Sequence, residues 1–161
     1  MADIEAATVE DLLDAAFGAD RFGRTAYRLR EGTTAIPALS FAIVEDGALV
    51  GTIQCWPVAH RDVAGGSTPL VMVGPVAVRP DVQRGGHGRA LMAHMLDAAD
   101  AKADGALMMI GDPEYYGRFF GFTADATGEW DLPGPYEKRR LLARRVNGHD
   151  VPPGAGMIRP R

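Results

Sequence analysis

The sequence predicts an α/β fold in which a mixed sheet lies beneath helices on both of its faces. Three observations support this prediction. Runs rich in β-branched residues extend over Ser40–Val58 around a turn at Glu45–Gly47. The run Leu70–Val78 is almost wholly apolar, which is typical of a strand covered on both faces. Apolar residues then recur at helical spacing over Arg89–Ala103, a pattern that predicts a helix packed on the sheet.

The bulk composition is that of a globular protein with one core. The 161 residues include 47% hydrophobic and 24% charged residues, so we expect 1–161 to form a single domain with an irregular tail over 151–161. The net charge of −4 provides no positive field for nucleic acid, which we do not expect as a partner.

The sequence gives no sign of export or of membrane insertion. The opening Met1–Glu5 is acidic and resembles no signal peptide, and no apolar run reaches the length of a membrane span. Cys55 is the single cysteine, which excludes an internal disulfide. A buried cysteine between Gln54 and Trp56 is more often a small hydrophobic residue than a nucleophile. These features predict a cytoplasmic protein.

Two helices are predicted before the sheet. The first covers Val9–Phe17, with Thr8–Asp11 resembling a capping box, and ends at Gly18. The second begins at Asp20 and ends near Gly32. Its apolar residues at amphipathic spacing are Phe22, Ala26, Tyr27 and Leu29.

The sheet begins with a predicted hairpin of Ser40–Val44 and Ala48–Val58. A loop is expected over His60–Pro69, followed by the central strand Leu70–Val78. Gly74–Pro75 interrupts that strand, and proline cannot donate a ladder hydrogen bond. We therefore expect a bulge or local splaying of strands there, a departure that often marks a site.

The remaining elements follow in alternation. We expect the helix Arg89–Ala103 to stop at Gly105, and then a strand over Ala106–Ile110, a short helix over Pro113–Phe120 and a late strand over Arg140–Val146. The segments Trp130–Pro135 and Val151–Gly156 are rich in proline and glycine and are expected to be irregular, with Trp130 packed.

A glycine-rich loop, Gln83–Arg89, joins the central strand to the following helix. Its three glycines allow successive N–H groups to point outward beside the positive end of the helix dipole, and its two arginines add charge, so the loop suits a phosphate. The simplest alternative is a connecting turn. A Walker loop would need Lys and then Ser or Thr after Gly88, where Arg89–Ala90 stand. A dinucleotide fingerprint would need glycine at Leu91.

The pattern Gln83-x-x-Gly86-x-Gly88 resembles the motif of the GNAT superfamily of N-acetyltransferases. It follows Val76–Asp81, which is similar to that family's central strand and its exit, and it precedes Tyr115–Phe122, which is similar to the family's late tyrosine and Gly–Phe pair. The resemblance covers Ser40–Asp125. It implies a mostly antiparallel sheet whose central strands splay apart to hold the pantetheine arm of a cofactor.

The resemblance also implies a function: transfer of an acetyl group from acetyl-CoA to a small-molecule or peptide amine in a ternary complex. Tyr116 is the first candidate for the acid that protonates the leaving thiolate and Tyr115 is the second. The usual tyrosine position, four residues before the Gly–Phe glycine, is here Gly117. The residues expected to bind the cofactor are Val76, Ala77, Val78, Gln83, Arg84, Gly85, Gly86, His87, Gly88, Arg89, Asp112 and Phe119.

Several points stay open at the level of sequence. The general base is not assigned. Glu114 and His60 are candidates because they lie near candidate site segments in the sequence, and a water chain could also accept the proton. A non-catalytic acyl-CoA-binding or sensing module and a nucleotide-binding protein are the alternative functions. His87 and His94 have no evident third ligand, so no metal is predicted. The sequence carries no motif that is diagnostic of the acceptor. A homodimer is possible as an assembly, since dimers are common among the proteins that this chain resembles.

Overall fold

The computed structural model describes residues 4–161, so the acidic opening discussed above lies mostly outside the described residues. The sheet runs in the order β5-β7-β2-β3-β4-β6. β1 and β7 both pair with the same edge of β2: β1 with its first half and β7 with its last residues. Only β3–β4 and β5–β7 are parallel, so the sheet is mixed and mostly antiparallel, as predicted. The strands are β1 (Phe41–Glu45), β2 (Ala48–Asp62), β3 (Ser67–Val78), β4 (Ala106–Ile110), β5 (Trp130–Asp131), β6 (Leu141–Arg144) and β7 (Gly156–Pro160).

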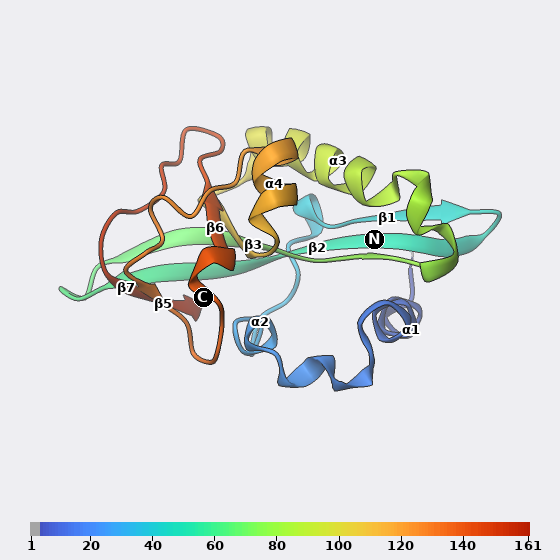
Figure 1. Ribbon diagram of the computed structural model, residues 1–161, viewed down its shortest axis with the longest axis horizontal. Coiled ribbons are helices and arrows are strands. Elements are labelled where there is room, and N and C mark those ends of the chain that lie inside the picture. Colours follow the sequence, from blue (N-terminus) through green and yellow to red (C-terminus); the bar gives the residue numbers. More distant parts are fainter. Residues whose placement is uncertain (1–3) are drawn as a thin grey trace.

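Helices cover both faces of this sheet, which confirms the predicted architecture (Figure 1). The helices α3 and α4 lie on one face, and α1 and α2 lie on the other. Their bounds are α1 (Ala6–Phe17), α2 (Thr25–Arg28), α3 (His87–Lys102) and α4 (Pro113–Phe120), with short 3₁₀ helices at Ala19–Gly23, Pro37–Leu39, Pro80–Gly85 and Lys138–Arg140. Within residues 4–161 none of the helices has the length and apolar character needed to cross a bilayer.

The hairpin β1–β2 forms as predicted around Asp46 and Gly47. Both residues have positive φ, 50° and 77°, the combination that tight hairpin turns require and that glycine adopts without a Cβ clash. Glu45 and Ala48 close the turn as cross-strand partners.

The central strands separate at the point where the proline interrupts β3. The β2–β3 register shifts between Ile53 and Cys55, opposite Gly74–Pro75, which confirms the predicted bulge. On its other edge β3 pairs with β4 only as far as Met72 and Met108. From there to Val78, that edge of β3 has no strand partner in the described part of the chain. The splay implied by the family resemblance is therefore present.

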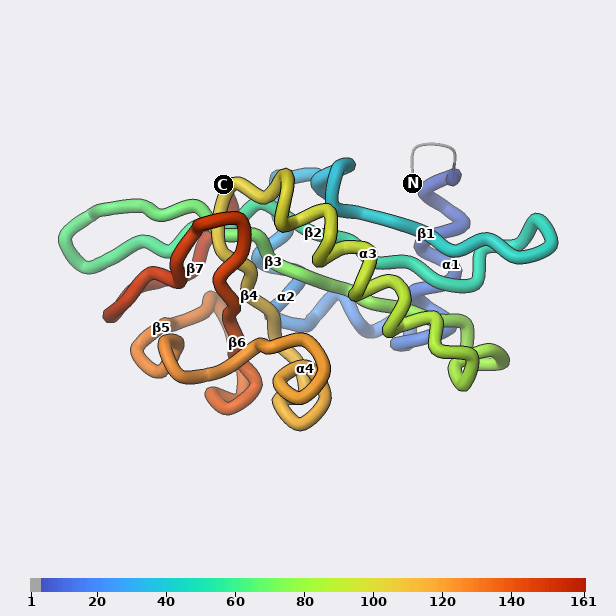
Figure 2. Tube along the Cα trace, turned by 90° about the horizontal axis from the view of Figure 1, so that it is seen from above, coloured from blue at the N-terminus to red at the C-terminus, as the bar shows by residue number. Residues whose placement is uncertain are grey.

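Helix α3 crosses β2 and β3 and closes the larger core (Figure 2). It begins at His87, two residues before the predicted start, and buries the predicted stripe of Leu91, Met92, Met95 and Ala99. These side chains pack on inward-facing residues of the central strands, where Cys55 is also fully buried. The methionines thus fill the core, as a flexible apolar side chain does where gaps are irregular.

The N-terminal segment departs from its prediction in two ways. Helix α1 begins at Ala6 rather than Val9, because Glu5 O accepts the N–H groups of Thr8 and Val9, at 3.0 and 3.3 Å; Thr8 is inside the helix and no capping box forms. Gly18 does end the helix, with φ 88°.

The predicted second helix is broken in two. Arg24 is extended, with ψ 147°, and separates the 3₁₀ helix Ala19–Gly23 from the single turn of α2. Asp20 does not cap it, since the N-cap position belongs to Gly18. The amphipathic reading also fails at one residue, because Phe22 is 59% exposed while Arg21 is buried.

The predicted loop His60–Pro69 is mostly strand. β2 continues to Asp62 and β3 starts at Ser67, so the connection is only residues 63–66. The Asp62 carboxylate accepts the N–H groups of Ala64 and Gly66, at 2.9 and 2.8 Å, and this closes the turn. Local glycine content indicated a loop, but long cross-strand pairing extended both strands through it.

The C-terminal tail is not irregular throughout. Residues 151–155 lack regular structure, but β7 pairs antiparallel with β2, and β5 pairs with β7. Arg161 fastens this edge: its guanidinium donates to the carbonyl of Val58 at 2.6 Å and to Asp104 at 2.7 Å. The predicted late strand is shorter than expected, running from Leu141 to Arg144.

Candidate active site

The glycine loop forms a shallow hollow at the start of α3. A 3₁₀ helix over Pro80–Gly85 leads into Gly86, whose φ of 76° is left-handed and favours glycine. The first helical hydrogen bond of α3 runs from Ala90 N–H to Gly86 O, at 3.1 Å, so the N–H groups of the preceding turn have no intrahelical acceptor. The hollow measures about 390 Å³ and is lined by Pro80, Asp81, Val82, Gln83, Arg84, Gly85 and His87. These features suit an anion.

The polar side chains of the loop have different surroundings, and of the two arginines only Arg84 lines the hollow. Arg84 is exposed and forms no ion pair or hydrogen bond with any residue of 4–161. Arg89 stacks across to α4, with its Cζ 4.1 Å from the ring centroid of Phe119. Gln83 donates to Val78 O at 3.4 Å, which ties the loop to the end of β3.

His87 lies at the helix start, where both of its ring nitrogens meet an acceptor. Its Nδ1 lies 3.2 Å from Val82 O and its Nε2 lies 2.7 Å from the Glu45 carboxylate. Two acceptors can be satisfied together only by an imidazolium, which has two N–H donors. The hydrogen bond with Glu45 accordingly raises the pKa of His87 above its usual 6.5.

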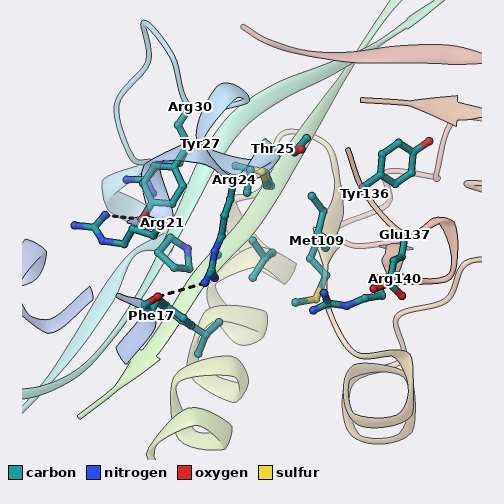
Figure 3. A pocket seen from close by; sticks show the side chains of 18 of the residues that line it. Phe17, Arg21, Arg24, Thr25, Tyr27, Arg30, Met109, Tyr136, Glu137 and Arg140 are labelled. Carbon is teal, nitrogen blue, oxygen red and sulfur yellow. Dashed lines mark hydrogen bonds between the residues drawn. The ribbon is translucent and has the colours of Figure 1, made fainter. Parts of the chain in front are cut away.

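A cleft of about 850 Å³ opens where β3 and β4 part. Met72–Val76 of β3 form one wall, and Met109–Asp112 with Tyr116 form the facing wall. The first helices and the segment before β6 complete it, as Figure 3 shows for ten labelled residues. Its remaining lining residues are Phe17, Arg21, Gly23, Arg24, Thr25, Ala26, Tyr27, Arg30, Pro135, Tyr136, Glu137 and Arg140.

The two neighbouring tyrosines of α4 have different surroundings. Tyr116 lines the cleft, and its ring lies so close to Gly111 that a Cβ there would be 2.8 Å from Tyr116 Cδ2. Its hydroxyl has no hydrogen-bond partner among residues 4–161. Burial raises the pKa of Tyr116, so the phenol stays protonated at neutral pH. Tyr115 is outside the cleft lining and packs edge-on against Tyr116, with ring centroids 4.9 Å apart.

Asp112 caps α4 at the cleft wall. Its carboxylate accepts the N–H of Glu114 at 3.0 Å, which satisfies one of the free donors at the helix start. Hydrogen bonding to Glu114 lowers the pKa of Asp112. The cleft therefore holds a charged carboxylate close to the Tyr116 ring.

The predicted site residues fall into three groups. Val76, Asp112 and Tyr116 line the cleft, and Gln83, Arg84, Gly85 and His87 line the hollow, whereas Gly86, Gly88 and Arg89 do not. Ala77 is buried against α1, and Val78 packs on the α3 core. The two candidate bases lie elsewhere: Glu114 pairs with Arg139, and His60 is buried beside Trp130 with Nε2 3.2 Å from Gly154 O.

Sequence reasoning missed most of the cleft's polar lining. Arg24, Arg30, Glu137 and Arg140 come from two segments more than a hundred residues apart, and Figure 3 shows them on different sides of the same space. Neither segment carries a motif that would have indicated a place in the cleft. No group of histidine, cysteine and acidic residues suited to a metal occurs within 4–161.

Comparison with known proteins places this geometry in a family. A model of the acetyltransferase (GNAT) family matches residues 6–122. The structure is similar to that of a GNAT family N-acetyltransferase, YhbS, from Escherichia coli in complex with CoA, with 25% identity, a TM-score of 0.72 and coverage of 99% of this chain and 87% of that one. It is also similar to a GNAT family acetyltransferase from Brucella melitensis in complex with acetyl-CoA, with 26% identity, a TM-score of 0.65 and coverage of 95% and 87%. No curated protein matches the chain.

Proposed function

The chain belongs to the acetyltransferase (GNAT) family, and from that premise we propose that it transfers an acetyl group from acetyl-CoA directly to an amine. The observation that carries the proposal is the separation of β3 from β4 beside a glycine loop. The unpaired edge of β3 leads from the cleft at Val76 to the hollow at Pro80. The two similar acetyltransferases, one in complex with CoA and one with acetyl-CoA, support the choice of cofactor.

The residues present fit acetyl-CoA along this path. The loop N–H groups, Arg84 and the start of α3 suit the pyrophosphate. The free edge of β3 beyond Met72 offers backbone N–H and C=O groups for the pantetheine amides, by the same pairing that adds a strand to a sheet. We propose that Arg89 and Phe119, which already touch, form the outer wall at the phosphate end.

When bound, acetyl-CoA supplies a thioester whose carbonyl carbon takes the amine nitrogen as its C–S bond breaks. A β3 N–H donates to the carbonyl oxygen as negative charge develops there. Tyr116 donates its phenolic proton to the leaving sulfur, and the proton that the amine nitrogen loses returns to solvent or to the phenolate. The cleft walls hold the two reactants together and exclude water.

The test is calorimetric titration of the protein with acetyl-CoA, beside ATP and NAD, in wild type and in Gly88→Glu. Gly88 lies in the first turn of α3, and a Cβ there meets nothing closer than 3.9 Å, so the substitution blocks the anion site without backbone strain. Ala93→Glu, an exposed position one turn later, is the matched control. We expect selective binding of acetyl-CoA that Gly88→Glu abolishes and Ala93→Glu retains.

Other outcomes would point to the alternatives. Preference for ATP or NAD would make the loop a nucleotide site. Binding of acetyl-CoA without transfer to any amine in a broad library would favour a sensing module. Butanoyl-CoA in the same titration measures whether the pocket selects the acetyl group.

We also propose that residues 1–161 act as one domain. The cleft takes its walls from the first helices, the central strands, α4 and the segment before β6, so none of these units forms it alone.

A further inference from the structure

We propose that the acceptor amine carries an anionic group, a carboxylate or a phosphate, which Arg24 and Arg30 bind at the N-terminal side of the cleft. The proposal rests on the acetyltransferase function proposed above and names the class of its acceptor. The charged side chains that line the cleft carry the proposal, together with the ion pairs that they do or do not form.

The N-terminal segment contributes arginines and no carboxylate to the cleft lining. Arg21 is neutralised, because it is buried and pairs with Glu10 and, at 3.0 Å, with Asp14. Arg24, in contrast, donates only to the carbonyl of Phe17, at 3.3 Å. Arg30 forms no ion pair with any residue of the described chain. Two arginines that line the cleft therefore form no ion pair with a residue of 4–161.

Arg30 is held in place by two aromatic rings. Its Cζ lies 4.2 Å from the ring centroid of Tyr27 and 4.0 Å from that of Trp56, so the planar group is fixed between them. Its Nη1 is buried and has no acceptor within residues 4–161. A buried donor without a partner is costly, and a ligand carboxylate or phosphate would satisfy it with a charge-assisted hydrogen bond.

The other side of the cleft suits an ammonium group. Asp112 and Glu137 supply the carboxylates of the lining, to which Tyr116, the proposed acid, and Arg140 also belong. Figure 3 shows Glu137 and Arg140 on the side away from Arg21 and Arg30, with Arg24 reaching into the space between. A polyamine would place its second cation beside Arg24 and Arg30, which like-charge repulsion disfavours. A small zwitterionic amine would place its anionic group beside Arg24 and Arg30 and its ammonium group beside the carboxylates.

The experiment compares amines of equal length and different charge. Acetyl transfer is measured as release of the CoA thiol with 4-aminobutanoate, 1-aminobutane and 1,4-diaminobutane, and with 3-aminopropylphosphonate as the phosphate-like probe. We expect kcat/KM for an anionic probe to exceed that for 1-aminobutane by about tenfold or more, the scale of one hydrogen bond to a charged group. The ratio between carboxylate and phosphonate then distinguishes the two sources of anion.

Substitutions test the two arginines separately. Arg24→Gln and Arg30→Gln should raise KM for the anionic probe by about ten- to a hundredfold and leave 1-aminobutane nearly unaffected. Arg28→Gln is the control, since Arg28 lies between the two arginines in the sequence but donates to Pro133 O and is outside the lining. Arg24→Glu should shift preference toward 1,4-diaminobutane, a gain that a misfolded protein would not show.

The outcomes distinguish failure of the proposed anion site from failure of the proposed acetyl transfer. If acetyl-CoA binds and 1-aminobutane or 1,4-diaminobutane is the better acceptor, or if the arginine variants behave like Arg28→Gln, the anion site is wrong and acetyl transfer stands. If acetyl-CoA does not bind, the proposed function fails. Titration of 4-aminobutanoate and 3-aminopropylphosphonate into the protein, with and without CoA, then tests the site directly, and absence of binding overturns it.

Discussion

The guanidinium of Arg89 lies over the ring of Phe119, with its Cζ 4.1 Å from the centroid, and this contact joins the first turn of α3 to the last turn of α4. The first helix follows the glycine loop and the second carries Tyr116. The contact therefore joins the helix at the proposed phosphate site to the helix that carries the proposed acid.

A double-mutant cycle should measure this contact. Arg89→Ala, Phe119→Ala and the double variant should show a coupling of about 0.5–1 kcal/mol in the free energy of unfolding, the value of an exposed cation–π pair. The cycle is measured by urea denaturation. Arg118, whose Cζ is 5.3 Å from the same ring, provides the comparison cycle, and we expect weaker coupling there. Zero coupling for Arg89 would mean that the two side chains do not meet in solution.

Tyr116→Phe should lower kcat by about a hundredfold or more, since it removes the proposed acid and leaves the ring in place. The affinity for acetyl-CoA should change little, because the phenol is proposed to act on the leaving sulfur. Tyr115→Phe is the matched control, as Tyr115 is the adjacent tyrosine outside the cleft lining. The measurements are steady-state kinetics and calorimetry. An unchanged kcat in Tyr116→Phe would remove the acid assignment and leave the cofactor site untouched.

The His87–Glu45 pair should make stability depend on pH. Because Glu45 raises the pKa of His87 in the folded protein, the pair stabilises the fold fully below the unfolded value of about 6.5, while Glu45 stays ionised, and loses this contribution as pH rises through the folded pKa. Glu45→Gln should thus lower the free energy of unfolding most below the unfolded pKa of about 6.5 and least above the raised folded pKa.

The direct measurement for that pair is an NMR titration of the histidine ring protons in wild type and Glu45→Gln. The His87 resonance should titrate at lower pH in the variant, while His94 and His149 provide references within the same sample. A His87 pKa that does not move would show that Glu45 is not its partner.

Cys55 should be unreactive in the folded protein. Burial raises the pKa of its thiol to about 12, and the side chain is fully buried in the core that β2 and β3 form with α3. At pH 8 only about one thiol in ten thousand is then ionised, and the thiolate is the reactive form. Labelling with a thiol reagent should be slow in buffer and fast in denaturing urea. Rapid labelling of the native protein would indicate that the sheet opens locally near the bulge.

The agreement between sequence and structure is greatest where the signal is local. The Asp46–Gly47 turn, the stripe on α3 and the bulge at Gly74–Pro75 each depend on backbone preferences or spacing within a few residues. The motif Gln83-x-x-Gly86-x-Gly88 is equally local, and it indicates the family to which the chain belongs.

Errors arise where distant segments meet. Arg21 interrupts an apolar pattern, yet Glu10 and Asp14 neutralise it, so it is buried while Phe22 is exposed. β7 has the glycine and proline content of a tail, but the free edge of β2 provides a ladder for it. A short window of sequence contains neither partner.

The sequence by itself determined the order of helices and strands up to α4, the glycine-rich loop before α3 and the family, because these follow from local backbone freedom, hydrophobic periodicity and a local motif. Tertiary structure decided which tyrosine of α4 faces the cleft, that Glu114 and His60 lie away from it, and that Arg24 and Arg30 share one space with Asp112 and Glu137. Those relationships depend on how the separated strands and the chain around them close in space, and no pattern along the chain specifies that closure.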